Sequence, residues 1–98
     1  MEGRTLKKKS NLFKILFRDK PVNLLTLLLT SKSKIYASIV AKEIDCTYSH
    51  VVKLLKILEE EGIVNVVKKG RLKYLSLTDE GKRLAEALYA AKQVIEGE

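Results

Sequence analysis

Residues 35–77 constrain the fold of this chain most, because two short helical patterns lead directly into a hairpin pattern. The spacing of apolar residues predicts one helix over 38–44 and a second over 48–61, with a tight turn of residues 45–47 between them. Gly62 is a helix stop, since glycine readily adopts the left-handed conformation that ends helices. This order predicts a single mixed α+β domain that is mainly helical.

The hairpin is predicted from two β-favouring runs, at 63–68 and 72–77, which flank a basic turn containing Gly70. Ile35 and Tyr36 form a candidate short strand that would pair with this hairpin. Thr47 offers a hydroxyl to the free N–H groups that begin the second helix. Asp45 is expected in the left-handed conformation, which aspartate tolerates better than most residues but less well than glycine.

The N-terminal part of the chain is expected to add helices to this unit. Residues 1–9 are polar and basic without a period, which predicts a flexible arm. A first helix is predicted to follow, with Ser10 or Asn11 as its cap and four apolar positions at helical spacing: Leu12, Phe13, Leu16 and Phe17. The next helix, at about 21–30, is apolar nearly all round, so we expect it to be the most buried element.

A last helix is predicted over 79–96, capped by Thr78. Its broad apolar stripe requires a partner, which is either the rest of its own domain or the same helix of a second chain. The residues that form the stripe are Leu84, Ala87, Leu88, Ala91, Val94 and Ile95. We see no internal repeat and no second domain in the 98 residues.

The net charge of +7 is concentrated in two places. Residues 1–20 contain seven basic side chains and two acidic ones, and residues 68–73 contain four basic side chains and no acidic one. Such clustering favours a polyanionic partner. The alternative is a solubility tail and a solvated turn. The single cysteine, the lack of an apolar run near the ~20 residues of a membrane helix and the lack of a signal peptide favour a cytoplasmic protein.

The helix over 48–61 has two different faces at 100° per residue. The inner face is apolar and comprises Val51, Leu54, Leu55 and Leu58. The outer face comprises Ser49, Val52, Lys53 and Lys56, with Tyr48 and His50 beside it. Three glutamates at 59–61 would be repelled by a polyanion, so the N-terminal half is the end expected to enter a nucleic-acid groove.

Metal binding and catalysis have little support. Cys46 and His50 are four residues apart, a spacing that can hold a metal, but a zinc shell takes four ligands and these are the only cysteine and histidine. We therefore expect no metal and no cofactor, and we interpret Cys46 as a small apolar side chain, with a redox thiol as the alternative. No nucleophile with a paired base is visible, so we expect no enzyme.

Several motifs resemble winged helix-turn-helix regulators. Residues 12–16 with Asp19-Lys20-Pro21 and the leucine-rich helix are similar to the start of ArsR-type repressors. Residues 39–64, with Ala41-Lys42-Glu43-Ile44 and Leu58-Glu59-Glu60-Glu61-Gly62-Ile63-Val64, are similar to the core of ArsR-, MarR- and PadR-like proteins, and 77–82 resembles their junction after the hairpin. Asp45 departs from the glycine common in the family turn.

The resemblance implies a three-helix core, a β-hairpin wing, extra terminal helices, duplex DNA as partner and a homodimer. The residues expected at the DNA are Thr47, Tyr48, Ser49, His50, Val52, Lys53, Lys56, Lys68, Lys69 and Arg71. The residues expected at the dimer interface are Leu12, Phe13, Leu16, Leu84, Leu88, Ala91 and Ile95. For individual positions other roles stay open: Lys53 and Lys56 as solvated lysines, Tyr48 as a core residue, and Arg71 as a charge that blocks pairing of strand edges.

Our first hypothesis is a sequence-specific regulator of transcription, a repressor, that binds double-stranded DNA. A winged-helix module that binds another protein within a larger assembly is the alternative from a different class, since folds are reused for other functions. A non-specific, chromatin-like DNA binder lies between the two. The residues indicate no particular small-molecule effector.

Overall fold

The computed structural model describes residues 14, 16–31 and 35–97. In this part of the chain the helices are α2 (Asp19–Thr30), α3 (Ala37–Glu43), α4 (Tyr48–Glu60) and α5 (Asp79–Glu96). The strands are β1 (Ile35–Tyr36), β2 (Val64–Lys69) and β3 (Leu72–Leu77). Most of the predicted first helix, including Leu12 and Phe13, lies outside the described residues, as does the predicted basic arm over 1–9.

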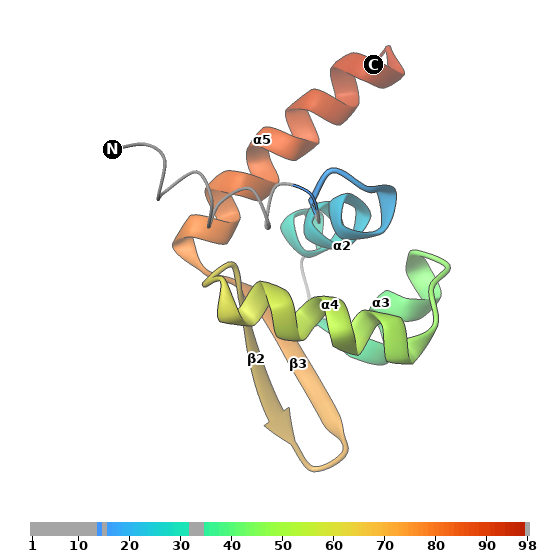
Figure 1. Cartoon of the computed structure of the whole chain (residues 1–98), viewed down its shortest axis with the longest axis vertical. Helices are drawn as coiled ribbons and strands as arrows, with labels where there is room; N and C mark the ends of the chain where they lie inside the picture. Colours follow the sequence, from blue (N-terminus) through green and yellow to red (C-terminus); the bar gives the residue numbers. More distant parts are fainter. Residues whose placement is uncertain (1–13, 15, 32–34, 98) are drawn as a thin grey trace.

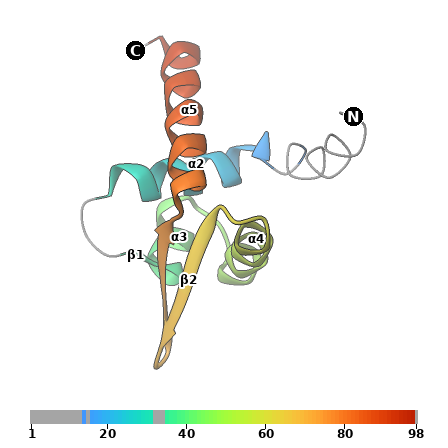
Figure 2. The same ribbon diagram turned by 90° about the vertical axis from the view of Figure 1, so that its left-hand side faces the viewer.

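The three strands form one antiparallel sheet in the order β1-β3-β2. Ile35 pairs with Leu75, which confirms that the short strand before α3 joins the hairpin. Gly70, with φ of 60°, turns the chain between β2 and β3. The hairpin extends away from the helices as a long projection (Figures 1 and 2). The observed α+β, mainly helical architecture is the one that the sequence predicted.

The core lies where α2, α3, α4 and the base of the sheet meet. Its largest fully buried side chains are Leu24, Leu25, Val40, Val51, Leu58 and Val64. All four inner-face residues of α4 are buried, as the 100° periodicity predicted. Burial of each such side chain stabilises the fold by roughly 1.5–3 kcal/mol, so this face fixes α4 firmly to the domain.

The expectation that α2 is the most buried element agrees with the structure, because only Asp19 and Thr30 of this helix are exposed. Leu24 and Leu25 are fully buried, and Leu27, Leu28 and Leu29 are half-buried. Helix α5 and strand β3 pack on α2, and Leu27 lines a pocket. The apolar pattern therefore predicted the place of α2 in the core, but not which of its leucines stay half-buried.

The turn between α3 and α4 is held by local contacts of the predicted kind. Asp45 adopts φ of 55°, and the Cys46 N–H donates to the carbonyl of Ala41 at 2.9 Å. The side chain of Thr47 accepts a hydrogen bond from the N–H of His50 at 3.2 Å, which confirms Thr47 as the cap of α4. These contacts fix the angle at which α4 leaves the turn.

The start of α5 is locked to the end of α4. Thr78 Oγ1 donates to the carbonyl of Gly62 at 2.7 Å and accepts from the N–H of Gly81 at 2.9 Å. A Cβ added to Gly81 would lie 1.9 Å from the carbonyl oxygen of Ile63, so only glycine fits at this crossing. Thr78 is thereby confirmed as the predicted cap of α5.

The two halves of α5 have different surroundings. The buried residues of α5 are Gly81, Ala85 and Leu88, and α5 packs on α2. Beyond them α5 projects away from the domain (Figure 1), and Val94 and Ile95 are 79% and 82% exposed. Among the described residues, no helix is long and apolar enough to cross a membrane.

Candidate nucleic-acid interface

Most of the outer side of α4 is exposed in the described part of the chain. Ser49, His50, Lys53 and Lys56 are exposed, and Val52 is half-buried between them. Tyr48 is 46% exposed, so its ring does not belong to the core. Thr47 is exposed too, although its hydroxyl caps the helix. A helix that is anchored by leucines on one side therefore presents a polar and basic stripe on the other.

The hairpin carries a second group of cations. Lys68, Lys69 and Arg71 are exposed, and Lys73 is half-buried. Lys68 pairs directly with Lys73 across β2 and β3. Like charges in such a cross-strand pair destabilise a sheet. A basic turn that served solubility alone would gain nothing from this placement, whereas a polyanion would remove its cost.

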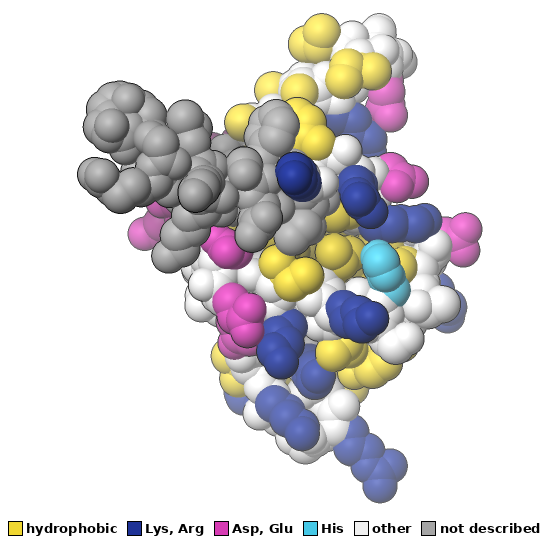
Figure 3. All heavy atoms as spheres, in the orientation of Figure 1, with side chains coloured by type: hydrophobic (Ala, Val, Ile, Leu, Met, Phe, Trp, Pro, Cys, Tyr) yellow, Lys and Arg dark blue, Asp and Glu magenta, His cyan; other side chains and the backbone are white. Residues whose placement is uncertain are grey.

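The paired lysines face the helical side of the sheet. Side chains alternate between the two faces of a strand, so Lys68 shares a face with Val64 and Val66, and Lys73 shares it with Leu75. Val64 and Leu75 are buried in the core at the base of the same face. Lys68 and Lys73 thus extend the side of the sheet on which α4 packs. Figure 3 shows Lys and Arg side chains over both α4 and the hairpin on one face of the molecule.

Two lysines near this surface, Lys73 and Lys20, were absent from the predicted set of interface residues. Lys73 is recognised only through the hairpin register, which places it opposite Lys68. Lys20 Nζ donates to the carbonyl oxygens of Ile44 and Asp45 at 3.0 and 2.9 Å, directly before α4. No spacing rule predicts this contact, because α2 and the turn are distant in sequence.

The two residues considered for a metal, Cys46 and His50, line one pocket but differ in exposure. Cys46 is half-buried against the core, whereas His50 is exposed on α4. In the described part of the chain, no three His, Cys, Asp or Glu side chains gather so that they could hold a metal ion. The sequence predicted a small buried apolar side chain in the turn; Cys46 packs against the core but is only half-buried.

The residues expected at a dimer interface fall into three groups. Leu16 and Leu88 are buried in the core of their own chain, and Leu84 is half-buried. Ala91 and Ile95 are exposed on α5. Leu12 and Phe13 lie outside the described residues. Phe17 is 63% exposed and Val94 is 79% exposed, whereas Leu16 and Leu88 are buried.

No protein-family model matches the chain. An uncharacterized protein of Archaeoglobus fulgidus is 25% identical over 88 residues, which span 87% of this chain and 93% of that protein. The crystal structure of AF1382 from Archaeoglobus fulgidus is similar with a TM-score of 0.78 and 26% identity, over 85% of this chain and 94% of that chain.

Two further solved structures have assigned roles. A transcriptional regulator of the MarR family from a Rhodococcus species has a TM-score of 0.74 and 25% identity, over 97% of this chain and 75% of that one. MepR of Staphylococcus aureus in complex with DNA has a TM-score of 0.75 and 21% identity, over 99% of this chain and 75% of that one. The chain therefore has the winged-helix fold found in these regulators of transcription.

Proposed function

We propose that this protein is a sequence-specific, double-stranded DNA-binding regulator of transcription that acts as a homodimer. Helix α4 enters the major groove, and the β2–β3 hairpin contacts the backbone or the minor groove. The observation that carries the proposal is the common face formed by the exposed stripe of α4 and the hairpin cations (Figure 3). The similarity to MepR, whose structure was solved with DNA, supports it.

The dimensions of α4 suit this role. A major groove about 12 Å wide admits one helix, and the first three residues of α4, Tyr48, Ser49 and His50, are all exposed. Ser49 and His50 lie where base edges would be read, and Lys53 and Lys56 can reach either guanine or phosphate. Thr47 and Tyr48 flank the entry point, and Val52 supplies an apolar contact. The acidic residues lie at the opposite end of the helix, away from the proposed groove.

The hairpin supplies affinity that does not depend on sequence. Lys68, Lys69 and Arg71 would each neutralise a phosphate, and each such contact releases counterions and steepens the salt dependence of binding. The mutual repulsion of Lys68 and Lys73 falls when phosphate lies beside them. The hairpin is therefore better suited to the bound state than to the free protein.

The homodimer would form through the projecting half of α5. Val94, Ile95 and Ala91 are exposed there, and Phe17 adds apolar surface beside them. Paired α4 helices about 34 Å apart would read adjacent major grooves, which implies a near-palindromic site. The similarity to a MarR-family regulator supports a regulator of this general type.

The test is a fluorescence anisotropy titration with a duplex selected from random DNA and with an unrelated duplex. Lys53→Ala with Arg71→Ala should weaken binding of the selected duplex at least tenfold and flatten its salt dependence by about one unit per lost phosphate contact. The control is Lys82→Ala with Arg83→Ala, which removes the same charges from the exposed start of α5.

Each alternative predicts a different result. Equal affinity for both duplexes would indicate a non-specific DNA binder. Absence of duplex binding at low salt, together with capture of a protein with an acidic face, would indicate an interaction module. If the Lys53/Arg71 variant and the Lys82/Arg83 control lost the same DNA affinity, the proposed orientation of α4 would be contradicted.

A further inference from the structure

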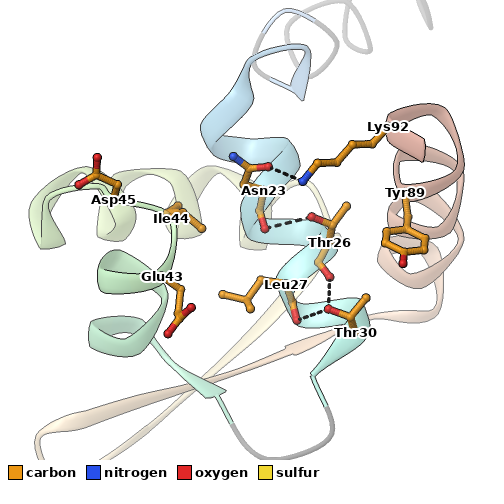
Figure 4. A pocket seen from close by; sticks show the side chains of 9 residues that line it. All are labelled: Asn23, Thr26, Leu27, Thr30, Glu43, Ile44, Asp45, Tyr89 and Lys92. Atoms are coloured by element: carbon orange, nitrogen blue, oxygen red, sulfur yellow. Dashed lines mark hydrogen bonds between the residues drawn. The ribbon is translucent and has the colours of Figure 1, made fainter. Parts of the chain in front are cut away.

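The open side of α2 forms the floor of a groove. Asn23, Thr26, Leu27 and Thr30 recur every three or four residues and make one continuous stripe along this helix. The end of α3 forms one wall, and α5 forms the other (Figure 4). The groove has a volume of about 430 Å³, within the range of small-molecule sites.

The two threonine hydroxyls on the floor of the groove already donate their protons to backbone carbonyls. Thr26, which is 6% exposed, donates its hydroxyl to the carbonyl of Asn23 at 3.2 Å. Thr30 donates to the carbonyl of Thr26 at 3.0 Å. A hydroxyl has one proton and two lone pairs, so both oxygens can still accept. Hydroxyl oxygens that can accept but not donate favour a ligand with N–H donors.

The α3 wall adds negative charge. Glu43 and Asp45 both line the groove, and Figure 4 shows Glu43 beside the α2 stripe with Asp45 turned away from it. Among the described residues, no cation lies within salt-bridge distance of the Glu43 carboxylate. Glu43 is also the last residue of α3, where the helix dipole disfavours an anion. Neither local charge pairing nor helix stability accounts for an acid at this position.

The α5 wall combines an aromatic ring with one cation. Tyr89, 38% exposed, lies across the stripe from Glu43 (Figure 4). Lys92 Nζ donates to Asn23 Oδ1 at 3.1 Å, at one end of the stripe. A positively charged ligand would be repelled from the Lys92 end and attracted to the Glu43 side, while its apolar part packs on Leu27 and Tyr89.

We propose that this groove binds a small organic cation, namely an amine with an aromatic or apolar body. The ammonium group donates to the Glu43 carboxylate and to the Thr30 hydroxyl oxygen, and the body covers Leu27 and the ring of Tyr89. The groove touches α5, α2 and the turn that precedes α4, so an occupant contacts both the projecting helix and the segment that holds α4. A role as effector of DNA binding rests on the proposed function, but the binding itself does not.

Three indole compounds with matched bodies test the charge preference: tryptamine is a cation, tryptophol is neutral, and indole-3-acetate is an anion. The chain has no tryptophan, so indole fluorescence reports only the ligand. Its anisotropy should rise saturably with protein for tryptamine and at least tenfold more weakly for the other two, because a charge-assisted hydrogen bond is lost. No DNA is present, so failure of the proposed function would not affect this result.

Variants locate the site. Glu43→Gln should weaken tryptamine binding about tenfold, and Tyr89→Ala should weaken it too. Glu86→Gln removes the same charge from an exposed position on α5 outside the groove and should leave the affinity unchanged. Circular dichroism of each variant checks the fold. Equal binding of the three compounds, no saturable binding of tryptamine at millimolar concentration, or equal effects of Glu43→Gln and Glu86→Gln would overturn the proposal.

Discussion

The ammonium nitrogen of Lys20 lies 2.9 Å from the backbone carbonyl oxygen of Asp45, and the same nitrogen lies 3.0 Å from the carbonyl oxygen of Ile44. Both carbonyls belong to the end of α3, where the helix leaves such groups without partners. The first turn of α2 therefore caps α3 and braces a turn in which Asp45 has a positive φ. Because α4 starts three residues later, we expect Lys20 to position the proposed DNA-reading helix rather than to contact DNA.

Replacement of Lys20 by methionine should show whether Lys20 affects DNA binding by positioning α4 or by contacting DNA. Hydrogen bonds to a charged group contribute about 1.5–3 kcal/mol, and partial exposure of Lys20 places the expected loss of unfolding free energy near the lower value. DNA affinity should fall, while the slope of affinity against salt stays as in the wild type, because no phosphate contact is removed. Lys53→Ala should instead reduce that slope. A smaller slope for Lys20→Met would identify Lys20 as a phosphate ligand.

Because α5 crosses close to the end of α4, alanine should destabilise the fold much more at Gly81 than at Gly62. Gly81→Ala should destabilise the fold by more than about 3 kcal/mol, because the new methyl group would meet the backbone carbonyl of Ile63, which cannot yield as a side chain could. Gly62→Ala, at φ of 77° with nothing within 4 Å, should cost only about 1–2 kcal/mol from the left-handed conformation. Urea unfolding measures both. Similar losses would mean that α5 can shift away from Ile63.

The exposed end of α5 predicts how the proposed dimer can be dissociated. Val94→Glu with Ile95→Glu should yield monomers in sedimentation velocity, since burial of two carboxylates in an apolar interface is strongly unfavourable. Affinity for a full palindromic site should fall, while affinity for a half-site should be unchanged. Lys82→Glu, at the exposed start of the same helix, is the control. An unchanged oligomeric state would place the interface elsewhere.

The sequence was sufficient where the deciding interactions are local. Thr47 and Thr78 cap the helices that follow them, and Asp45 takes the left-handed conformation, because these roles depend on residues within one turn. The inner face of α4 followed from periodicity for the same reason. Which leucines of α2 stay half-buried did not follow from the sequence, because the coverage of Leu27 depends on which distant elements pack beside it.

In the candidate site, too, the sequence predicts local features but not contacts between distant segments. Exposure of Lys53 and Lys56 could be inferred from the spacing within one helix. The contact of Lys20 with the turn joins segments 25 residues apart, and no sequence pattern encodes it. The importance of Lys73 depends on which residue of β2 it faces, and a shift by one residue would place a different side chain there. Register and tertiary placement are thus what the structure adds.

The facing lysines of the hairpin predict that stability and DNA binding can be changed in opposite directions. Lys73→Glu replaces a repulsive cross-strand pair with an attractive one opposite Lys68, so the free energy of unfolding should rise by about 0.5 kcal/mol. DNA affinity should fall and its salt dependence should flatten, because a cation is lost and an anion is placed near phosphate. Lys73→Thr, which only removes the charge, should give a smaller change in both quantities. Thermal unfolding and anisotropy titrations on the same samples measure the two effects. If Lys73→Glu left DNA affinity intact, the hairpin face with Lys68 would not be the one turned towards the backbone.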